Sequence, residues 1–350
     1  MQTVMVNASV PYPVHIGGGL LEKAGELIAG VTKSRTCAVI TDTTVEKLYA
    51  APVCRSLQDA GFKVCLHAFP AGERNKNLGT FGGMLEFLAE NKLTRSDFVV
   101  ALGGGVTGDM AGFAAAAYQR GVDYIQMPTT FLAASDSSVG GKTAIDLAAG
   151  KNLAGAFHQP KLVICDTDTF RTLPEDAFAD GVAETVKHGL IADKDFYHFL
   201  MTEDVRARID QVVRRNVEIK AAVVGEDEKE RGKRKLLNFG HTLGHAIEKC
   251  SGYTVSHGRA VAAGMVLASH AAEKLGYSPA GTLEAVTSAC RRFGLPAACP
   301  YTASELYAAA TGDKKRDGGS IDVVVLEEIG RAKTVRLDLE GLRAFTEAAL

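Results

Sequence analysis

Short apolar runs alternate with helical patterns through the first half of this 350-residue chain, and this alternation limits the possible folds more than any other feature. Buried-strand patterns occur at residues 37–41, 98–102 and 162–165, and helical periodicity covers residues 45–60 and 80–90. Strands that alternate with helices form a largely parallel sheet with helices packed on its faces. We therefore expect a Rossmann-like α/β domain in the N-terminal half.

The pattern changes after residue 173, and helical periodicity covers nearly every segment to about residue 310. Residues 321–326 and 332–337 look extended and are expected to form a hairpin. A chain of this length exceeds a typical single hydrophobic core. We therefore expect an N-terminal α/β domain over residues 1–172 and a C-terminal, mainly α-helical domain over residues 173–350.

Three histidines in the second half indicate a divalent metal site. His241 and His245 are one helical turn apart, and His257 follows. Positions i and i+4 share one helix face, and a catalytic zinc takes three protein ligands and keeps one open position. Spacing alone favours His241 and His245 as the ligand pair. Glu184 is the best candidate for a carboxylate ligand, because it lies in a helical pattern beside Lys187 and a histidine.

A glycine turn follows the strand pattern at residues 98–102. Gly103, Gly105 and Gly108 have G-x-G-x-x-G spacing and open a helical pattern, as in dinucleotide-binding folds, where a pyrophosphate binds at the helix N-terminus. Asp42 suits the acidic residue that holds ribose hydroxyls, although it precedes the turn instead of following it. Close helix–sheet packing remains an alternative role for any one of these glycines.

Cationic and polar residues are distributed among small residues on both sides of the expected domain boundary. Residues 127–145 contain hydroxyls, Asp136 and Lys142, and Lys151 and Asn152 are expected on a turn. A P-loop is disfavoured, because its first glycine would fall at Asp136. The mixed-charge residues 226–235 are expected to form a solvated loop, with Arg234 as the exception. Further cations suited to a substrate with a carboxylate and a phosphate are Lys187, Lys220, Arg234, Lys314 and Lys315.

Composition narrows the class of protein. The net charge of −2 argues against a nucleic-acid-binding surface, which needs a clustered excess of lysine and arginine. The seven cysteines form no C-x-x-C pair, which favours reduced thiols over a disulfide framework. No apolar run has the length of a transmembrane helix, and the first residues do not resemble a signal peptide. We expect a cytoplasmic protein that binds neither nucleic acid nor membrane.

Taken together, the motifs resemble those of the 3-dehydroquinate synthases, a family of sugar-phosphate cyclases, in both order and spacing over nearly the whole length. The matching segments are residues 103–109, 118–121, 128–130, 136–143, 150–152, 184–188, 238–245, 257–258 and 313–315. Arg316 is a local departure, since asparagine often follows the Asp-Lys-Lys run in the family. It leaves both lysines intact.

The resemblance implies conversion of 3-deoxy-D-arabino-heptulosonate 7-phosphate to 3-dehydroquinate and phosphate in the shikimate pathway. The reaction passes through transient oxidation by NAD+, phosphate elimination, reduction, ring opening and aldol closure, so NAD+ is regenerated. It requires NAD+ and a divalent metal, usually Zn2+, with Co2+ as an alternative. The enzyme would be a phosphate-eliminating carbon–oxygen lyase.

The resemblance also implies a role for each matching residue. It places the metal on Glu184, His241 and His257, and makes His245 a proton-transfer group beside the substrate, in contrast to the ligand pair that spacing favours. Implied NAD+ contacts are Asp42, Glu73, Lys76, Gly105, Val106, Thr107, Gly108, Asp109, Thr129, Thr130, Lys142, Lys151, Thr169, Phe170, Arg171 and Thr172. Implied substrate contacts are Asp136, Lys142, Asn152, Lys187, Lys220, Arg234, Asn238, His245 and one of Lys314 and Lys315.

The family match further implies a homodimer in which Arg120 reaches the substrate phosphate of the neighbouring subunit. Three alternatives remain at this point. One is a cyclase of the 2-deoxy-scyllo-inosose or 2-epi-5-epi-valiolone synthase type, whose substrate lacks the carboxylate that Lys220 and Arg234 would meet. The others are a metal-dependent polyol dehydrogenase of the glycerol dehydrogenase type and a non-catalytic NAD-binding protein.

Overall fold

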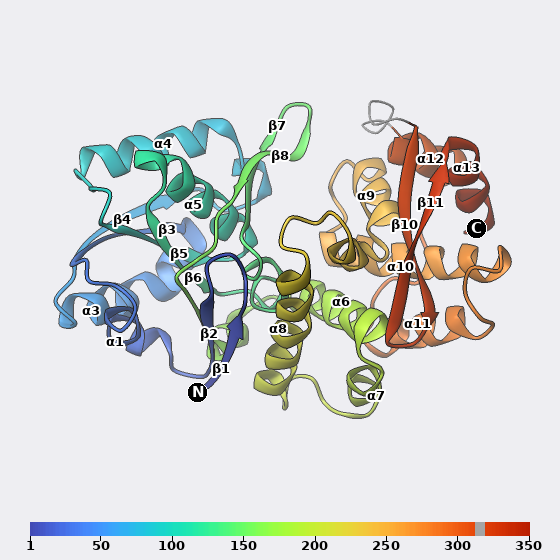
Figure 1. The fold of residues 1–350 in the computed structure, drawn as a ribbon, viewed down its shortest axis with the longest axis horizontal. Helices are drawn as coiled ribbons and strands as arrows, with labels where there is room; N and C mark the ends of the chain where they lie inside the picture. The colour runs from blue at the N-terminus through green and yellow to red at the C-terminus, as the bar shows by residue number, and fades with distance from the viewer. Residues whose placement is uncertain (312–318) are drawn as a thin grey trace. The chain divides into compact units, whose positions relative to one another are not determined.

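The computed structural model describes residues 1–311 and 319–350, and their contacts divide the chain into two compact units (Figure 1). The first unit comprises Met1–Leu173 and Ile209–Lys229, and the second comprises Pro174–Arg208 and Glu230–Leu350. The chain thus leaves the first unit close to the expected boundary, and then returns to it for one helix.

A seven-stranded sheet with the order β1-β2-β9-β6-β5-β3-β4 forms the centre of the first unit. Neighbouring strands are parallel except at one edge, where β1 pairs with β2 in antiparallel fashion. The largely parallel sheet confirms the Rossmann-like expectation. Its strands are β1 (Gln2–Val6), β2 (Tyr12–Gly17), β3 (Thr36–Asp42), β4 (Lys63–Phe69), β5 (Phe98–Gly103), β6 (Asp123–Pro128) and β9 (Leu162–Asp166).

Helices cover both faces of this sheet, which is why its central strands are apolar at successive positions instead of alternating ones. Val39 and Val100 pack in a core on the side of α1 (Ala24–Ala29) and α3 (Ala51–Asp59). Ile40 and Ala101, their neighbours in sequence, pack in a second core with α4 (Leu78–Glu90) and α5 (Gly105–Ala117). Burial of each large aliphatic side chain stabilises such a layer by about 1.5–3 kcal/mol.

The order of the strands creates a switch point between β3 and β5. The chain passes from β3 outward to β4, and α4 then returns it to β5 on the other side of β3. Ligands of open α/β sheets bind outside the carboxyl ends of the strands at such a point. Asp42 ends β3, and the glycine turn that ends β5 leads directly into α5.

Helix α8 (Ile209–Glu226) packs on the first unit, although it lies in the range expected for the helical domain. It contacts β1 and β2, beside which Figure 1 draws it in olive. Thr167 donates a hydrogen bond to Asp210 (2.6 Å), and the Asn216 amide donates one to Ser135 Oγ (3.1 Å). Helical periodicity identifies a helix but does not reveal which core receives its apolar face, so the sequence could not assign α8.

A second hairpin in the first unit, β7 (Lys142–Leu147) with β8 (Gly150–Phe157), was not expected. Lys151 and Asn152 therefore lie on a strand, and the expectation that they lie on a turn was wrong. Glycine and small residues hid the alternating pattern. In Figure 1 the hairpin projects as a green ribbon at the top of its unit.

The second unit is mainly helical, as expected, and the expected hairpin forms from β10 (Ser320–Glu328) and β11 (Arg331–Asp338). In the described residues, no helix has the combined length and hydrophobicity required to cross a bilayer. The helices of the second unit are α6 (Glu175–Ala192), α7 (Lys194–Thr202), α9 (His241–Cys250), α10 (His257–Lys274), α11 (Thr282–Arg292), α12 (Ala303–Thr311) and α13 (Leu339–Ala348).

Glycines bring α6, α9 and α10 into close contact. A Cβ added at Gly264 of α10 would overlap the carbonyl oxygen of Gly240 and lie 2.7 Å from the backbone nitrogen of Gly244. A Cβ at Gly258 would lie 2.6 Å from the carbonyl oxygen of Asp180 in α6. Backbone atoms cannot move aside as a flexible side chain can, so these helices approach only because the glycines lack side chains.

We predict that Gly264→Ala lowers the free energy of unfolding by about 1–3 kcal/mol, because the added methyl group forces α9 and α10 apart. Gly83→Ala is the control, since Gly83 lies inside α4 with open space around it. That substitution should stabilise the protein by about 0.4–1 kcal/mol by restricting the unfolded chain. Urea denaturation measures both variants, and equal stability of the two would contradict the packing argument.

Candidate active site

Three side chains from three helices of the second unit converge on one point. Glu184 comes from the middle of α6, and His241 and His257 are the first residues of α9 and α10. Glu184 Oε1 lies 3.5 Å from His241 Nε2 and 3.6 Å from His257 Nε2, and the three donor atoms lie within 4.8 Å of one another. Donor atoms at zinc bond lengths in a tetrahedron are roughly 3.3–3.5 Å apart. The spacing therefore fits a tetrahedral metal site with three protein ligands.

The two carboxylate oxygens of Glu184 face different partners. Oε1 faces the imidazoles, whereas Oε2 forms an ion pair with Lys187, one helical turn further along α6. Both side chains are fully buried. Ionised groups leave water only when they are paired or bind a metal, so the ion pair keeps the carboxylate available as a ligand.

His241 is held in the tautomer that a metal ligand requires. Its Nδ1–H donates a hydrogen bond to the carbonyl oxygen of Phe239 (3.1 Å), which leaves the lone pair of Nε2 directed at Glu184. Burial lowers the pKa of His241 to about 3, and the positive charge of Lys187 acts in the same direction. The imidazole is therefore neutral at physiological pH, as metal coordination requires.

His257 lies between two carboxylates. Its Nε2 faces Glu184, and its Nδ1 lies 3.4 Å from Glu248 Oε2. Burial by itself would lower the pKa of His257, but the hydrogen bonds and negative charges of Glu184 and Glu248 outweigh it and raise the pKa to about 10. A metal that binds Nε2 near neutral pH therefore displaces a proton from this ring.

His245, Glu248 and His257 form a second group with donor atoms close enough for a metal. This group would have to use Nδ1 of His257, and the His245 side chain is 61% exposed. The Glu184 group has the more buried donors and an imidazole already oriented by the backbone, so we regard it as the better metal site. The ring of His241 lies 5.4 Å from that of His245 and 5.3 Å from that of His257, so ring distance does not choose between the two pairs. The buried carboxylate of Glu184, which lies within 3.6 Å of both His241 and His257, favours His257 over His245 as the second imidazole ligand.

The glycine turn of the first unit lies at the switch point of the sheet. Thr107 in the first turn of α5 donates a hydrogen bond to Asp42 Oδ2 (3.4 Å), which connects the ends of β5 and β3. The hydroxyl oxygens of Thr41 and Thr129, at the carboxyl ends of β3 and β6, are buried without a hydrogen-bond partner among the described residues. Uncapped helix N–H groups beside unsatisfied hydroxyls form a site that fits a dinucleotide.

Five expected site residues lie beside this turn, three in one hydrogen-bonded network and two in an ion pair. Lys76 Nζ contacts Asp109 (2.6 Å) and the amide oxygen of Asn152 (2.5 Å), and Lys151 lies 3.5 Å from Glu73. Burial raises the pKa of Asp109, and the ion pair with Lys76 opposes that shift. The segments that contain these residues are distant in sequence, so the fold alone brings them together.

Other expected residues of the first unit occupy defined positions. Lys220 of α8 bonds both the backbone oxygen of Asp136 (2.5 Å) and its carboxylate (2.8 Å). Lys142 begins β7 with an exposed side chain. Thr130 Oγ1 accepts the Ala133 N–H (3.1 Å).

The expected cofactor-contacting segment Thr169, Phe170, Arg171 and Thr172 is part of the short helix Thr167–Thr172. Tyr49 OH donates to the carbonyl oxygen of Thr169 (3.1 Å) and lies 2.5 Å from Thr172 Oγ1. These bonds hold the segment against the helical region that follows β3.

Arg120 occupies an unusual exposed turn after α5. It adopts φ +66° and follows Gln119 at φ +51°, so two consecutive residues with side chains have left-handed backbone conformations. Each such residue costs on the order of 1 kcal/mol or more, and strain of this kind is concentrated at functional sites.

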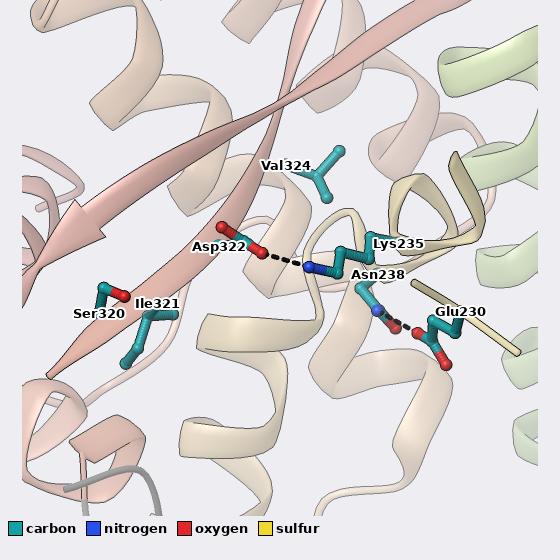
Figure 2. Close-up of a pocket in the computed structure, with 7 residues that line it drawn as sticks. All are labelled: Glu230, Lys235, Asn238, Ser320, Ile321, Asp322 and Val324. Carbon is teal, nitrogen blue, oxygen red and sulfur yellow. Dashed lines mark hydrogen bonds and ion pairs between the residues drawn. The ribbon is translucent and has the colours of Figure 1, made fainter. Parts of the chain in front are cut away.

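Residues 230–238 line part of a hollow of about 290 Å³ in the second unit (Figure 2). Asn238 donates to Glu230 (2.7 Å), and Lys235 pairs with Asp322 of β10 (2.6 Å). Arg234 is fully buried. Residues 227–232 are irregular, with Lys229, Arg231 and Gly232 exposed, as expected for a solvated loop, whereas Glu230 and Lys235 are half-buried at the hollow. Sequence reasoning missed Glu230, because a mixed-charge run does not distinguish it from surface residues. Lys314 and Lys315 lie outside the described residues.

Comparisons with known proteins match this chain over most of its length. Two family models match in succession, 3-dehydroquinate synthase N-terminal at residues 66–180 and 3-dehydroquinate synthase C-terminal at residues 181–316. The curated 3-dehydroquinate synthase of Enterococcus faecalis is 45% identical over 340 residues, which cover 95% of each chain. That of Streptococcus suis is 42% identical over 346 residues, which cover 97% of this chain and 98% of the relative.

Solved structures of sugar-phosphate cyclases have the same fold. A 2-deoxy-scyllo-inosose synthase complexed with carbaglucose-6-phosphate, NAD+ and Co2+ superposes with a TM-score of 0.89 at 26% identity over 99% of each chain. The 2-epi-5-epi-valiolone synthase of Streptomyces hygroscopicus subsp. jinggangensis 5008, with NAD+ and Zn2+ bound, has a TM-score of 0.84 at 26% identity over 95% of each chain. A probable glycerol dehydrogenase of Sinorhizobium meliloti, at 16% identity and a TM-score of 0.68, shares the fold alone.

We predict that His257→Ala binds zinc at least tenfold more weakly than the wild-type protein, because it removes one of three ligands. His245→Ala is the matched control, since its ring lies outside the Glu184 group, and it should keep the full zinc content. Metal analysis after dialysis against a weak chelator measures both. Zinc retained by His257→Ala and lost by His245→Ala would refute the ligand assignment.

Proposed function

The chain belongs to the 3-dehydroquinate synthase family, and we propose that its two units supply the cofactor, metal and substrate groups of that enzyme. Its function is the conversion of 3-deoxy-D-arabino-heptulosonate 7-phosphate to 3-dehydroquinate with release of phosphate, a cyclase reaction. In the structure, the convergence of Glu184, His241 and His257 is the observation that carries the proposed mechanism. The enzyme would be a carbon–oxygen lyase that depends on NAD+ and a metal.

The proposed cofactors are NAD+ and Zn2+, with Co2+ as an alternative. Support comes from the cyclase structures that contain NAD+ with Co2+ or Zn2+ and from the donor set in the second unit. When bound, the metal would polarise a substrate hydroxyl as a Lewis acid, and NAD+ would accept a hydride and later return it. Glu184, His241 and His257 would hold the metal. The glycine turn at residues 103–105 and the strand ends at Thr41 and Thr129 would hold NAD+.

Other residues of the second unit would orient the substrate and move its protons. Lys187 pairs with the Glu184 carboxylate, and its charge adds to the burial that lowers the pKa of His241. His245 Nε2 belongs to an exposed imidazole on the same helix as a metal ligand, which suits exchange of a proton with the substrate.

The anionic groups of the substrate require cations with fixed positions. Lys220 is held by Asp136, and Arg234 is held in a buried position beside Asn238. A guanidinium matches the two oxygens of a carboxylate or phosphate. The proposed substrate contacts are Asp136, Lys142, Asn152, Lys187, Lys220, Arg234, Asn238, His245 and one of Lys314 and Lys315.

A homodimer is part of the proposal, with Arg120 acting on the substrate phosphate of the neighbouring subunit. The strained, exposed turn that presents Arg120 supports a role beyond surface charge. We also propose a cytoplasmic location, in agreement with seven cysteines that are all free.

We predict sustained turnover at NAD+ concentrations far below that of the substrate, because each cycle returns its hydride. The measurement follows phosphate and 3-dehydroquinate together with NADH absorbance. Only a small steady-state NADH signal is expected. One NADH accumulating for each product molecule would support a dehydrogenase of the same fold and refute the synthase mechanism.

We predict that Arg120→Ala and Lys142→Ala chains, each nearly inactive alone, regain activity when they are mixed under conditions that exchange subunits. In a heterodimer, one site would contain both native side chains if Arg120 acts across the interface. Native mass spectrometry verifies the exchange. Heterodimers with no activity above the two parents would place Arg120 in the site of its own subunit or outside the site.

A further inference from the structure

Glu248 is a buried carboxylate of α9 that faces the ring of His257. Its Oε2 lies 3.4 Å from His257 Nδ1 and 4.0 Å from Nε2 of His245, and its side chain is 4% exposed. The backbone carbonyl of Glu248 accepts hydrogen bonds from Ser251 and Tyr253, which tie the end of α9 to the turn that follows it.

The two nitrogens of the His257 ring face two different carboxylates. Nε2 lies 3.6 Å from Glu184 Oε1, in the metal group, and Nδ1 faces Glu248. If a metal occupies the lone pair of Nε2, the neutral ring carries its proton on Nδ1 and donates it to Glu248. A carboxylate that accepts this N–H fixes the orientation and tautomer of a ligand and strengthens its basicity.

The other histidine of the group has a different partner. His241 Nδ1 donates to the neutral backbone carbonyl of Phe239. The Nδ1 atom of His241 therefore meets a backbone carbonyl, whereas the Nδ1 atom of His257 meets a carboxylate. Backbone already restrains His241 at the tight turn before α9, whereas the side chain of His257 is 34% exposed and has more need of a second restraint.

Direct ligation by Glu248 is less consistent with the geometry. A metal between Glu248 and His257 would take the lone pair of Nδ1, and the proton would then move to Nε2, which faces the Glu184 group. That arrangement would remove His257 from the three donors that lie within 4.8 Å of one another around the buried carboxylate.

We propose that Glu248 is a positioning residue that orients His257 for metal binding through the hydrogen bond at Nδ1. The inference rests on the proposed function, in which Glu184, His241 and His257 hold the metal. Glu248 does not itself touch the metal or the substrate.

The test compares zinc affinities of Glu248→Gln, Glu184→Gln and the control Glu273→Gln, each measured by competition of the metal-free full-length protein with a chromophoric chelator. Glu273 lies on the same helix as His257 and accepts a backbone N–H from Leu283 (2.6 Å), so its substitution makes the same chemical change away from the histidines. We expect Glu248→Gln to weaken zinc binding by about 10–100-fold. Glu273→Gln should match the wild type, and Glu184→Gln should lose nearly all affinity.

Two further readouts separate positioning from a general structural role. The melting temperature of the metal-free protein and its affinity for NAD+ should be the same in Glu248→Gln and in the wild type. If Glu248→Gln weakened zinc binding and also lowered both the melting temperature and the affinity for NAD+, the inference would be overturned.

Zinc affinity of Glu248→Gln equal to that of the wild type would also overturn it, as would a loss as complete as that of Glu184→Gln, which would make Glu248 a ligand. A different result would contradict the proposed function itself, namely that the wild-type protein and His257→Ala bind zinc with equal affinity.

Discussion

The buried ion pair between Glu184 and Lys187 is the interaction on which the second unit depends. Both side chains are removed from water on one helix, and a lone charge in that position would be strongly unfavourable. With Lys187 on one carboxylate oxygen, the other oxygen faces the Nε2 atoms of His241 and His257. Burial is the main cause of the low pKa of His241, and the charge of Lys187 acts in the same direction. Packing through Gly258 and Gly264 then brings α10 close enough for His257 to complete the group.

In the first unit, the backbone itself forms the site that fits a dinucleotide. The strand order reverses at the neighbouring strands β3 and β5, and the glycine turn after β5 leaves room for a ligand at the start of α5. Thr41 and Thr129 leave buried hydroxyls at the strand ends, and Lys76 joins Asp109 to Asn152 beside the turn. Together the two units explain why a reaction without net oxidation could use a fold that dehydrogenases share. The Glu184 group, the glycine turn and the cations with fixed positions are separate features of the chain, and the proposed reaction needs all of them.

The sequence predicted the helices and strands better than it predicted which of them pack or pair together. Apolar runs at β3, β5 and β9 and the β10–β11 hairpin follow directly from residue patterns, because burial of both faces or alternate positions leaves a periodic signal. Helix α8 carries a normal helical signal, but nothing local states that it packs on the first unit. The β7–β8 hairpin was missed because glycine and small residues conceal its alternation. In the site, spacing favoured His241 with His245, whereas family resemblance proposed His257. A distance between α9 and α10 cannot be read from either helix alone. The contact of Glu230 with Asn238 was missed because the mixed-charge run around it looks like surface sequence.

The ligand assignment of the metal is the central claim, and anomalous X-ray diffraction at the zinc absorption edge tests it most directly. Crystals of the zinc-loaded protein should show one strong anomalous peak in each chain, within bonding distance of Glu184 Oε1, His241 Nε2 and His257 Nε2. The fourth position should be taken by water or substrate. A peak between Glu248, His245 and His257 Nδ1, with Glu184 bound only to Lys187, would contradict the account, because the mechanism and the positioning role of Glu248 both depend on His257 using Nε2.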